Sequence, residues 1–364
     1  VRESADYSLC EHAMGAYERA LALDPRSSEA MAGLAWVHGV RHAFDDSISW
    51  ARKAAEADPR NPMAYGIQGD AALESGDYEA AFDSYQRMLD IRPDISSYSR
   101  GAWLLYITGD ARKGKWLMEK AIRSGAPYAE NTAWCRAQLA LMLFHEGAFV
   151  PAQQVLEQGL KAAPESPRLH AAMGRVKAAL GAFREAVGHY RRALNAAPDH
   201  RALVELGDLH RFLGERAEAE RCYEEVERLH RHLASQGVGG AMHMARFYAD
   251  HDRRLDEALR IAEDDWNHGG RNVFDADTLA WCRYKNGRFK EARQAIRHAL
   301  KRRVPDAAIL FHAGMICARL GERAAAQRFL HQALSMNPRF DLLDARVASD
   351  TLRELGDSTR RAKR

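Results

Sequence analysis

The sequence predicts an all-α protein, a right-handed helical solenoid of about nine helix–turn–helix repeats followed by a C-terminal capping helix. Three observations predict it: prolines, turn-forming glycines and small residues each recur at intervals of about 34 residues. The composition agrees, because 46% hydrophobic and 28% charged residues in a chain of 364 are ordinary for a folded protein. No run of about eighteen apolar residues occurs, which excludes a membrane-spanning helix.

Prolines and glycines set the boundaries of the repeats. Proline cannot continue a helix, and glycine readily takes the left-handed conformation that ends one. The prolines are Pro25, Pro59, Pro93, Pro127, Pro164, Pro198, Pro305 and Pro338. The glycines are Gly76, Gly109, Gly147, Gly181, Gly214, Gly287 and Gly321. A small residue follows each of these glycines five positions later, and a mostly small one follows twelve positions later.

Residues 167–198 show what lies between these boundaries. Apolar residues at helical spacing precede Gly181, and a second apolar stripe follows it up to Pro198. Ala186 and Ala193 carry only methyl groups where the two helices must approach closely. Because one hairpin of this size cannot bury both stripes, neighbouring hairpins must cover them, and a solenoid follows.

The elements are expected in a regular order. A half repeat ends at Pro25, and full repeats follow at about 27–60, 61–94, 95–128, 132–165, 166–199, 200–233, 239–268, 273–305 and 306–339. Segment 228–245 lacks proline and is rich in glycine, which indicates an over-long helix and then a flexible joint. A second break, 264–275, contains the turn pair Gly269–Gly270. We therefore expect an N-terminal part of the array over 1–233, a joint over 234–241, a C-terminal part over 242–339, a capping helix over 340–356 and a disordered tail over 357–364.

This pattern resembles the tetratricopeptide repeat, in which a small residue, a turn glycine, an alanine, an aromatic residue, an alanine and a proline follow one another. The matching residues are Gly174, Gly181, Ala186, Tyr190, Ala193 and Pro198 in one repeat, Gly69, Gly76, Ala81, Tyr85 and Pro93 in a second, and Gly314, Gly321, Ala326, Ala333 and Pro338 in a third. The resemblance covers nearly the whole chain. It implies that the first helix of each hairpin lines a concave face, and that this face binds a protein or peptide.

Motifs for catalysis or metal binding are not apparent in the sequence. There is no GxxxxGK[ST], HExxH, CxxC or GxSxG motif, and the five cysteines lie far apart. His38 and His42 have a spacing that could chelate a metal, but they have no third ligand nearby and are expected on the surface. We expect no cofactor and no metal. The chaperone-type carboxylate clamp and the asparagine ladder of other tetratricopeptide proteins are also not found.

One row of residues stands out on the predicted concave face. The residue six positions before each turn glycine falls midway along a first helix, and three of the seven tryptophans share this place. With their helical neighbours, the candidate partner-binding residues are Trp36, Trp103, Leu141, Phe144, Arg175, Asp208, Asp277, Trp281, Tyr284, Phe311 and Met315. Two interpretations stay open: a groove that is strongest near its C-terminal end, or rings that only pack against the next repeat.

The leading hypothesis is a non-catalytic scaffold that binds a protein or peptide in this groove. The alternatives are an accessory subunit or regulatory region of an enzyme whose catalytic part lies elsewhere, and a self-assembling structural array. A net charge of +3 does not indicate nucleic-acid binding, and no membrane insertion is expected. The chain does not begin with Met, so we expect a processed or trimmed product. The partner, the compartment, the oligomeric state and any domain upstream of Val1 stay open.

Overall fold

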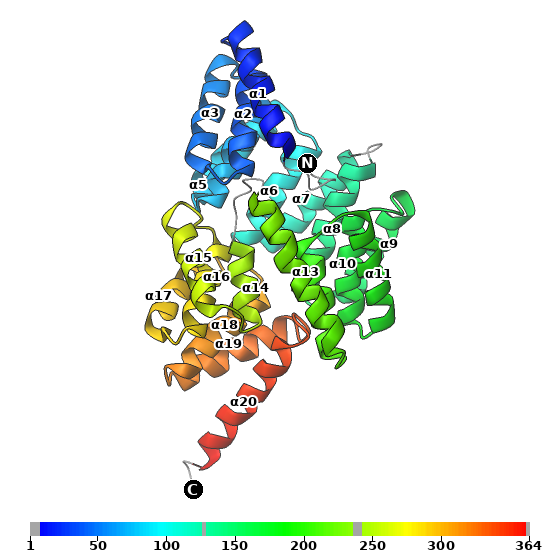
Figure 1. Ribbon diagram of the computed structural model, residues 1–364, viewed down its shortest axis with the longest axis vertical. Helices are drawn as coiled ribbons and strands as arrows, with labels where there is room; N and C mark the ends of the chain where they lie inside the picture. The colour runs from blue at the N-terminus through cyan, green and yellow to red at the C-terminus, as the bar shows by residue number, and fades with distance from the viewer. Residues whose placement is uncertain (1–7, 126–128, 236–241, 362–364) are drawn as a thin grey trace.

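The computed structural model describes residues 8–125, 129–235 and 242–361, and every regular element within them is an α-helix (Figure 1). The helices are α1 (Ser8–Leu23), α2 (Ser28–Val40), α3 (Phe44–Ala57), α4 (Pro62–Glu74), α5 (Tyr78–Ile91), α6 (Ile95–Ile107), α7 (Ala111–Ser124), α8 (Ala129–His145), α9 (Phe149–Ala162), α10 (Pro167–Ala179), α11 (Phe183–Ala196), α12 (His200–Phe212), α13 (Arg216–Ser235), α14 (Met242–Asp250), α15 (Leu255–Asn267), α16 (Val273–Lys285), α17 (Phe289–Leu300), α18 (Ala307–Arg319), α19 (Arg323–Met336) and α20 (Asp344–Arg361). The predicted all-α repeat fold is confirmed.

The irregular places differ in part from the expectation. α13 has 20 residues and is the over-long helix, while residues 236–241 of the predicted joint lie outside the described residues. α20 begins at Asp344 and continues to Arg361, so it extends through most of the segment predicted to be disordered. Residues 362–364 of that predicted tail are outside the described part of the chain.

Turns between paired helices use the left-handed backbone that the glycines predict. Gly181 has a φ of +81°, and seven other glycines also have positive φ. In the repeat that lacks a turn glycine, His42 takes this conformation with a φ of +59°. A non-glycine residue is sterically strained in this conformation. Because His42 lies in the turn after α2, it does not share a helix face with His38.

Within a hairpin, a glycine of the first helix faces a tyrosine of the second. A Cβ atom on Gly69 would lie 2.4 Å from the Tyr85 ring, and one on Gly207 would lie 2.5 Å from the Tyr223 ring. Only a residue without a side chain lets the aromatic ring reach the backbone of the neighbouring helix. The same contact recurs between Gly174 and Tyr190, so one steric rule sets the helix spacing in several repeats.

The solenoid closes on itself. Figure 1 shows α15 and α16 (yellow) beside α5, although Val273 of α16 and Tyr78 of α5, which bond there, lie 195 positions apart in the chain. Three interhelix turns of the N-terminal repeats touch three segments of the C-terminal repeats, and we call this contact the closing seam. Its pairs are Gly76 with Arg271, Gly109 with Arg302 and Gly147 with Met336. Core residues of α4 to α8 and of α12 to α20 consequently share one hydrophobic cluster.

Hydrogen bonds and rings hold the closing seam. The backbone N–H of Val273 donates to Tyr78 Oη at 2.7 Å, and the side-chain amide of Asn337 donates to the carbonyl of Phe144 at 2.7 Å. Between them, the rings of Trp103 and Phe274 stack with centroids 6.0 Å apart. The seam therefore joins apolar and polar groups along three successive repeats.

Turn glycines provide a matched test of the seam. A Cβ atom on Gly76 would lie 2.4 Å from the carbonyl oxygen of Arg271, whereas one on Gly181 would meet nothing within 4 Å. Both have similar φ, so Gly76→Ala and Gly181→Ala should share a backbone penalty of about 1–2 kcal/mol. We expect Gly76→Ala to cost about 1–3 kcal/mol more and to raise the radius of gyration in small-angle scattering. Equal melting points and equal radii for the two variants would contradict the closing seam.

Inter-helix packing can be tested at Ala186, which is fully buried beside Tyr190 and Leu206. Ala186→Leu should overpack this joint and destabilise the protein by about 1–3 kcal/mol, measured by thermal unfolding. A neutral result would show that the helices are not packed as described.

Candidate functional site

The residues predicted to bind a partner divide into two groups by burial. Half-buried ones are Trp36, Trp103, Leu141, Arg175, Asp208, Tyr284 and Met315. Fully buried ones are Phe144, Asp277, Trp281 and Phe311. Three of the four buried residues belong to α16 and α18, so the row is less accessible at its C-terminal end than at its N-terminal end.

Tyrosines of the second helices hold several of the charges on the inner face. Tyr85 Oη donates to Asp70 at 2.8 Å, and Tyr223 Oη donates to Asp208 at 2.7 Å. Asp70 also receives a bidentate pair of bonds from Arg100 of the next repeat, with Nε and Nη2 each 2.9 Å from a carboxylate oxygen. These carboxylates are fixed in place by the repeat packing itself.

The middle of the inner face carries two arginines that share one carboxylate. Arg175 of α10 and Arg201 of α12 both pair with Glu205, whose other oxygen accepts a hydrogen bond from Tyr190 at 3.0 Å. Burial and the charge of Arg201 lower the pKa of Arg175 to about 9. The Arg201 side chain is 60% exposed, so it presents a positive charge to solvent beside this half-buried pair.

At the C-terminal end, a charge network replaces the expected open patch. Asp277 accepts hydrogen bonds from His312 Nδ1 and from Arg246 Nη1, each at 2.8 Å. Burial alone would raise the pKa of Asp277, but His312 and Arg246 together lower it. Trp281 is 3% exposed and stacks on His312 with ring centroids 4.2 Å apart. The structure thus agrees with the second interpretation at this position, a ring packed between repeats.

Three side chains of metal-binding type converge next to this network. One ligand atom each of Asp250, His312 and Asp344 lies within 4.8 Å of the other two. However, Arg246 Nε donates to Asp250 at 2.8 Å, and Arg246 Nη2 lies 3.3 Å from His312 Nε2. The guanidinium already pairs with Asp250 and covers the imidazole nitrogen of His312, so two of the three candidate ligands are engaged by Arg246.

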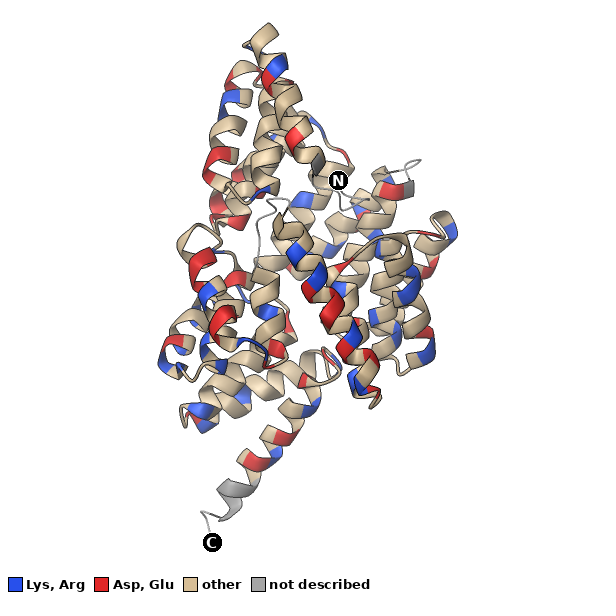
Figure 2. Cartoon of the chain, in the orientation of Figure 1, with Lys and Arg blue, Asp and Glu red and all other residues tan. Residues whose placement is uncertain are grey.

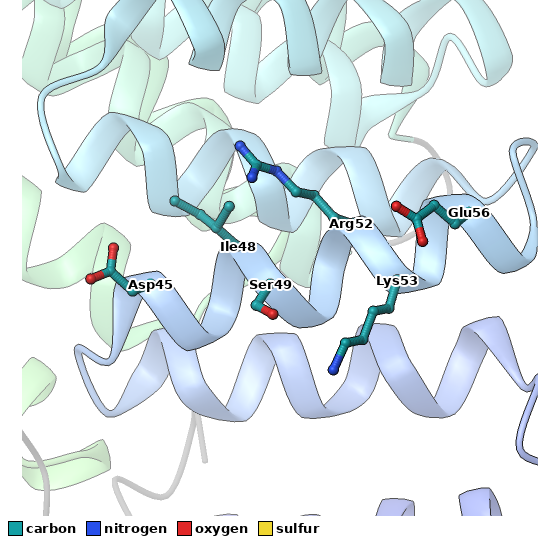
Figure 3. A pocket seen from close by; sticks show the side chains of 6 residues that line it. All are labelled: Asp45, Ile48, Ser49, Arg52, Lys53 and Glu56. Atoms are coloured by element: carbon teal, nitrogen blue, oxygen red, sulfur yellow. The ribbon is translucent and has the colours of Figure 1, made fainter.

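A surface hollow of about 500 Å³ lies on the outer side of α3. Figure 3 shows that the side chains lining it all come from this one helix, among them Asp45, Arg52, Lys53 and Glu56. A face formed by one helix, with charges of both signs, does not enclose a ligand. Figure 2 likewise shows acidic and basic residues interspersed along α13 and the other helices in view.

Sequence reasoning missed Arg201, Arg246 and His312. None of them lies six positions before a turn glycine, so the repeat spacing in the sequence did not point to them. Arg246 and His312 could have been found only by placing α14, α16 and α18 side by side.

Among the described residues, no helix is long and apolar enough to cross a membrane.

A chain of paired helices that stack at intervals of about 34 residues is an α-helical repeat protein. Comparison with family models gives the particular class. Tetratricopeptide repeat models match residues 11–62, 44–94 and 278–338, and a further one matches residues 200–229. The chain therefore carries tetratricopeptide repeats at these residues.

Individual relatives share less with this chain. The small glutamine-rich tetratricopeptide repeat-containing protein 2 of Mycosarcoma maydis is 29% identical over 89 residues, which is 24% of this chain and a quarter of that protein's length. Human IFIT1, solved as a dimer with PPP-AAAA, has a TM-score of 0.49 and 16% identity, covering 84% of this chain and 72% of its own. Pseudomonas aeruginosa PilF has a TM-score of 0.45 and 17% identity, and the match covers 56% of this chain and 91% of the PilF chain.

Two tryptophans at the same repeat position test the division by burial. Trp281 is fully buried and Trp36 is half-buried. We expect Trp281→Ala to destabilise the protein by about 3–5 kcal/mol, because it leaves a cavity between α16 and α18, and Trp36→Ala to cost about 1–2 kcal/mol. Melting curves of the two variants measure both losses of stability. A larger loss of stability for Trp36→Ala than for Trp281→Ala would contradict the difference in burial.

Proposed function

We propose that the protein is a non-catalytic scaffold that binds a protein or peptide partner along the inner face of its N-terminal repeats, α2 to α12. The observation that carries the proposal is the half-buried row on these helices, which contains both fixed charges and large apolar side chains. The tetratricopeptide repeats support it, because stacked repeats of this kind offer extended concave surfaces.

Four of the half-buried residues have a defined place in this proposal. Trp36 and Leu141 supply apolar contact area, and aromatic rings do so with little loss of rotamer freedom. Arg175 and Asp208 supply charges of opposite sign that are already held by Glu205 and Tyr223. Groups that need no reorganisation lose less entropy when a partner binds, which favours recognition of an extended peptide.

The test compares the inner and outer faces. A photo-crosslinking side chain at position 201 should capture the partner, whereas one at position 116, where Trp116 is 55% exposed on the outer helix α7, should not. With the captured partner purified, Trp36→Ala should weaken binding about tenfold, because anchor residues contribute at least about 1–2 kcal/mol. The matched control is Trp116→Ala. Crosslinking only at position 116 would place the binding surface on the outer face and end the proposal.

A further inference from the structure

Three carboxyl groups lie around the contact between Gly76 and Arg271 in the closing seam. Glu74 ends α4, Asp265 lies in α15 and Asp275 lies in the first turn of α16. Asn272 connects them, because its side-chain amide donates to Glu74 at 2.8 Å and its backbone N–H donates to Asp275 at 3.2 Å. A Cβ atom on Gly270 would lie 2.0 Å from an oxygen of Asp265 and 3.3 Å from one of Asp275. The cluster therefore brings N-terminal and C-terminal repeats together.

The groups facing this cluster do not neutralise it. Asp70 of α4 adds negative charge, and His42 in the α2–α3 turn is kept neutral because burial lowers its pKa. His42 and His268 oppose the effect of burial on the pKa of Asp265, but burial outweighs them. Arg271 donates to the carbonyl of Trp266, and Arg302 lies over the Tyr78 ring at 5.1 Å. Among the described residues, no Lys or Arg forms an ion pair with Glu74, Asp265 or Asp275.

Crowding and burial therefore favour the protonated form of these carboxyl groups. Burial raises the pKa of Glu74 and of Asp265. Burial, followed by the charges of Asp265 and Glu74, raises the pKa of Asp275 to about 8. When the seam opens, water reaches these groups and the pKa of each should return towards its ordinary value of about 4.

We propose that the closing seam is a proton-dependent latch, in which the cluster of Glu74, Asp265 and Asp275 holds α15 and α16 against α4 and α5 while it retains a proton, and releases them when all three ionise. The sign follows from linkage: the closed form binds protons more tightly than the open form, so closure is favoured at low pH and weakens between about pH 4 and pH 8. Opening would uncover Trp103, which stacks on Phe274 in the closed form. Only this last consequence rests on the proposed function.

The test uses hydrogen exchange of the intact chain. The backbone N–H groups of Arg271 and Val273 bond across the seam, to the Glu74 carbonyl at 3.1 Å and to Tyr78 Oη. After correction for the intrinsic exchange rate, we expect their protection factors to fall about tenfold or more between pH 6 and pH 9. Amides inside α10, which lies away from the cluster, should keep their protection.

Isosteric variants identify the groups responsible. Asp275→Asn keeps the carbonyl oxygen that accepts from Asn272 but cannot ionise, so protection at Arg271 and Val273 should lose most of its dependence on pH over this range. Glu74→Gln should reduce the dependence in the same way if Asp275→Asn does not fold. Asp256→Asn, at an exposed position of α15, should leave the wild-type dependence unchanged. The latch would be overturned if the wild-type protection factors of Arg271 and Val273 did not change between pH 6 and pH 9. It would also be overturned if both isosteric variants lost protection as the wild type does, or if amides inside α10 lost protection equally.

Discussion

The contact on which the rest of the structure depends is the one between a glycine of a first helix and the tyrosine ring of its second helix. Gly69 with Tyr85, Gly174 with Tyr190 and Gly207 with Tyr223 bring helix axes closer than a side chain would allow. The same contact places the tyrosine hydroxyl at the inner face, where it holds Asp70, Glu205 or Asp208. One steric feature therefore sets both the hairpin geometry and the charges of the candidate site. Because the helix pairs themselves recur at nearly constant intervals, small rotations add up to a superhelix.

Local signals predicted the fold well. Proline and glycine act on the backbone next to them, and apolar spacing acts over one or two helical turns, so repeat boundaries can be read from adjacent residues. Even the exception at His42 was visible as a turn without its glycine. Residues 357–364 are predicted to be disordered because chain ends fray, whereas the helix α20 continues through most of them.

The site was predicted less well, because burial at the row position depends on residues far away in the chain. Trp36 and Trp281 have the same repeat register, but Trp281 is sealed by His312 and Phe311 of the next first helix. The closing seam has no local signal either. It follows from the accumulated rotation of the repeats, and a bulkier residue at a few glycines would alter that path without changing the spacing of the repeats in the sequence.

The closing seam also limits how the array can change during evolution. In an open solenoid each repeat touches only its neighbours, so duplication or loss of a repeat leaves the other contacts intact. Here Gly76, Gly109 and Gly147 meet segments from the far end of the array, as the pairs with Arg271, Arg302 and Met336 show. One additional repeat between the two sides would move all three segments by a whole hairpin at once. The number of repeats between them is therefore constrained as strictly as the identity of a buried residue.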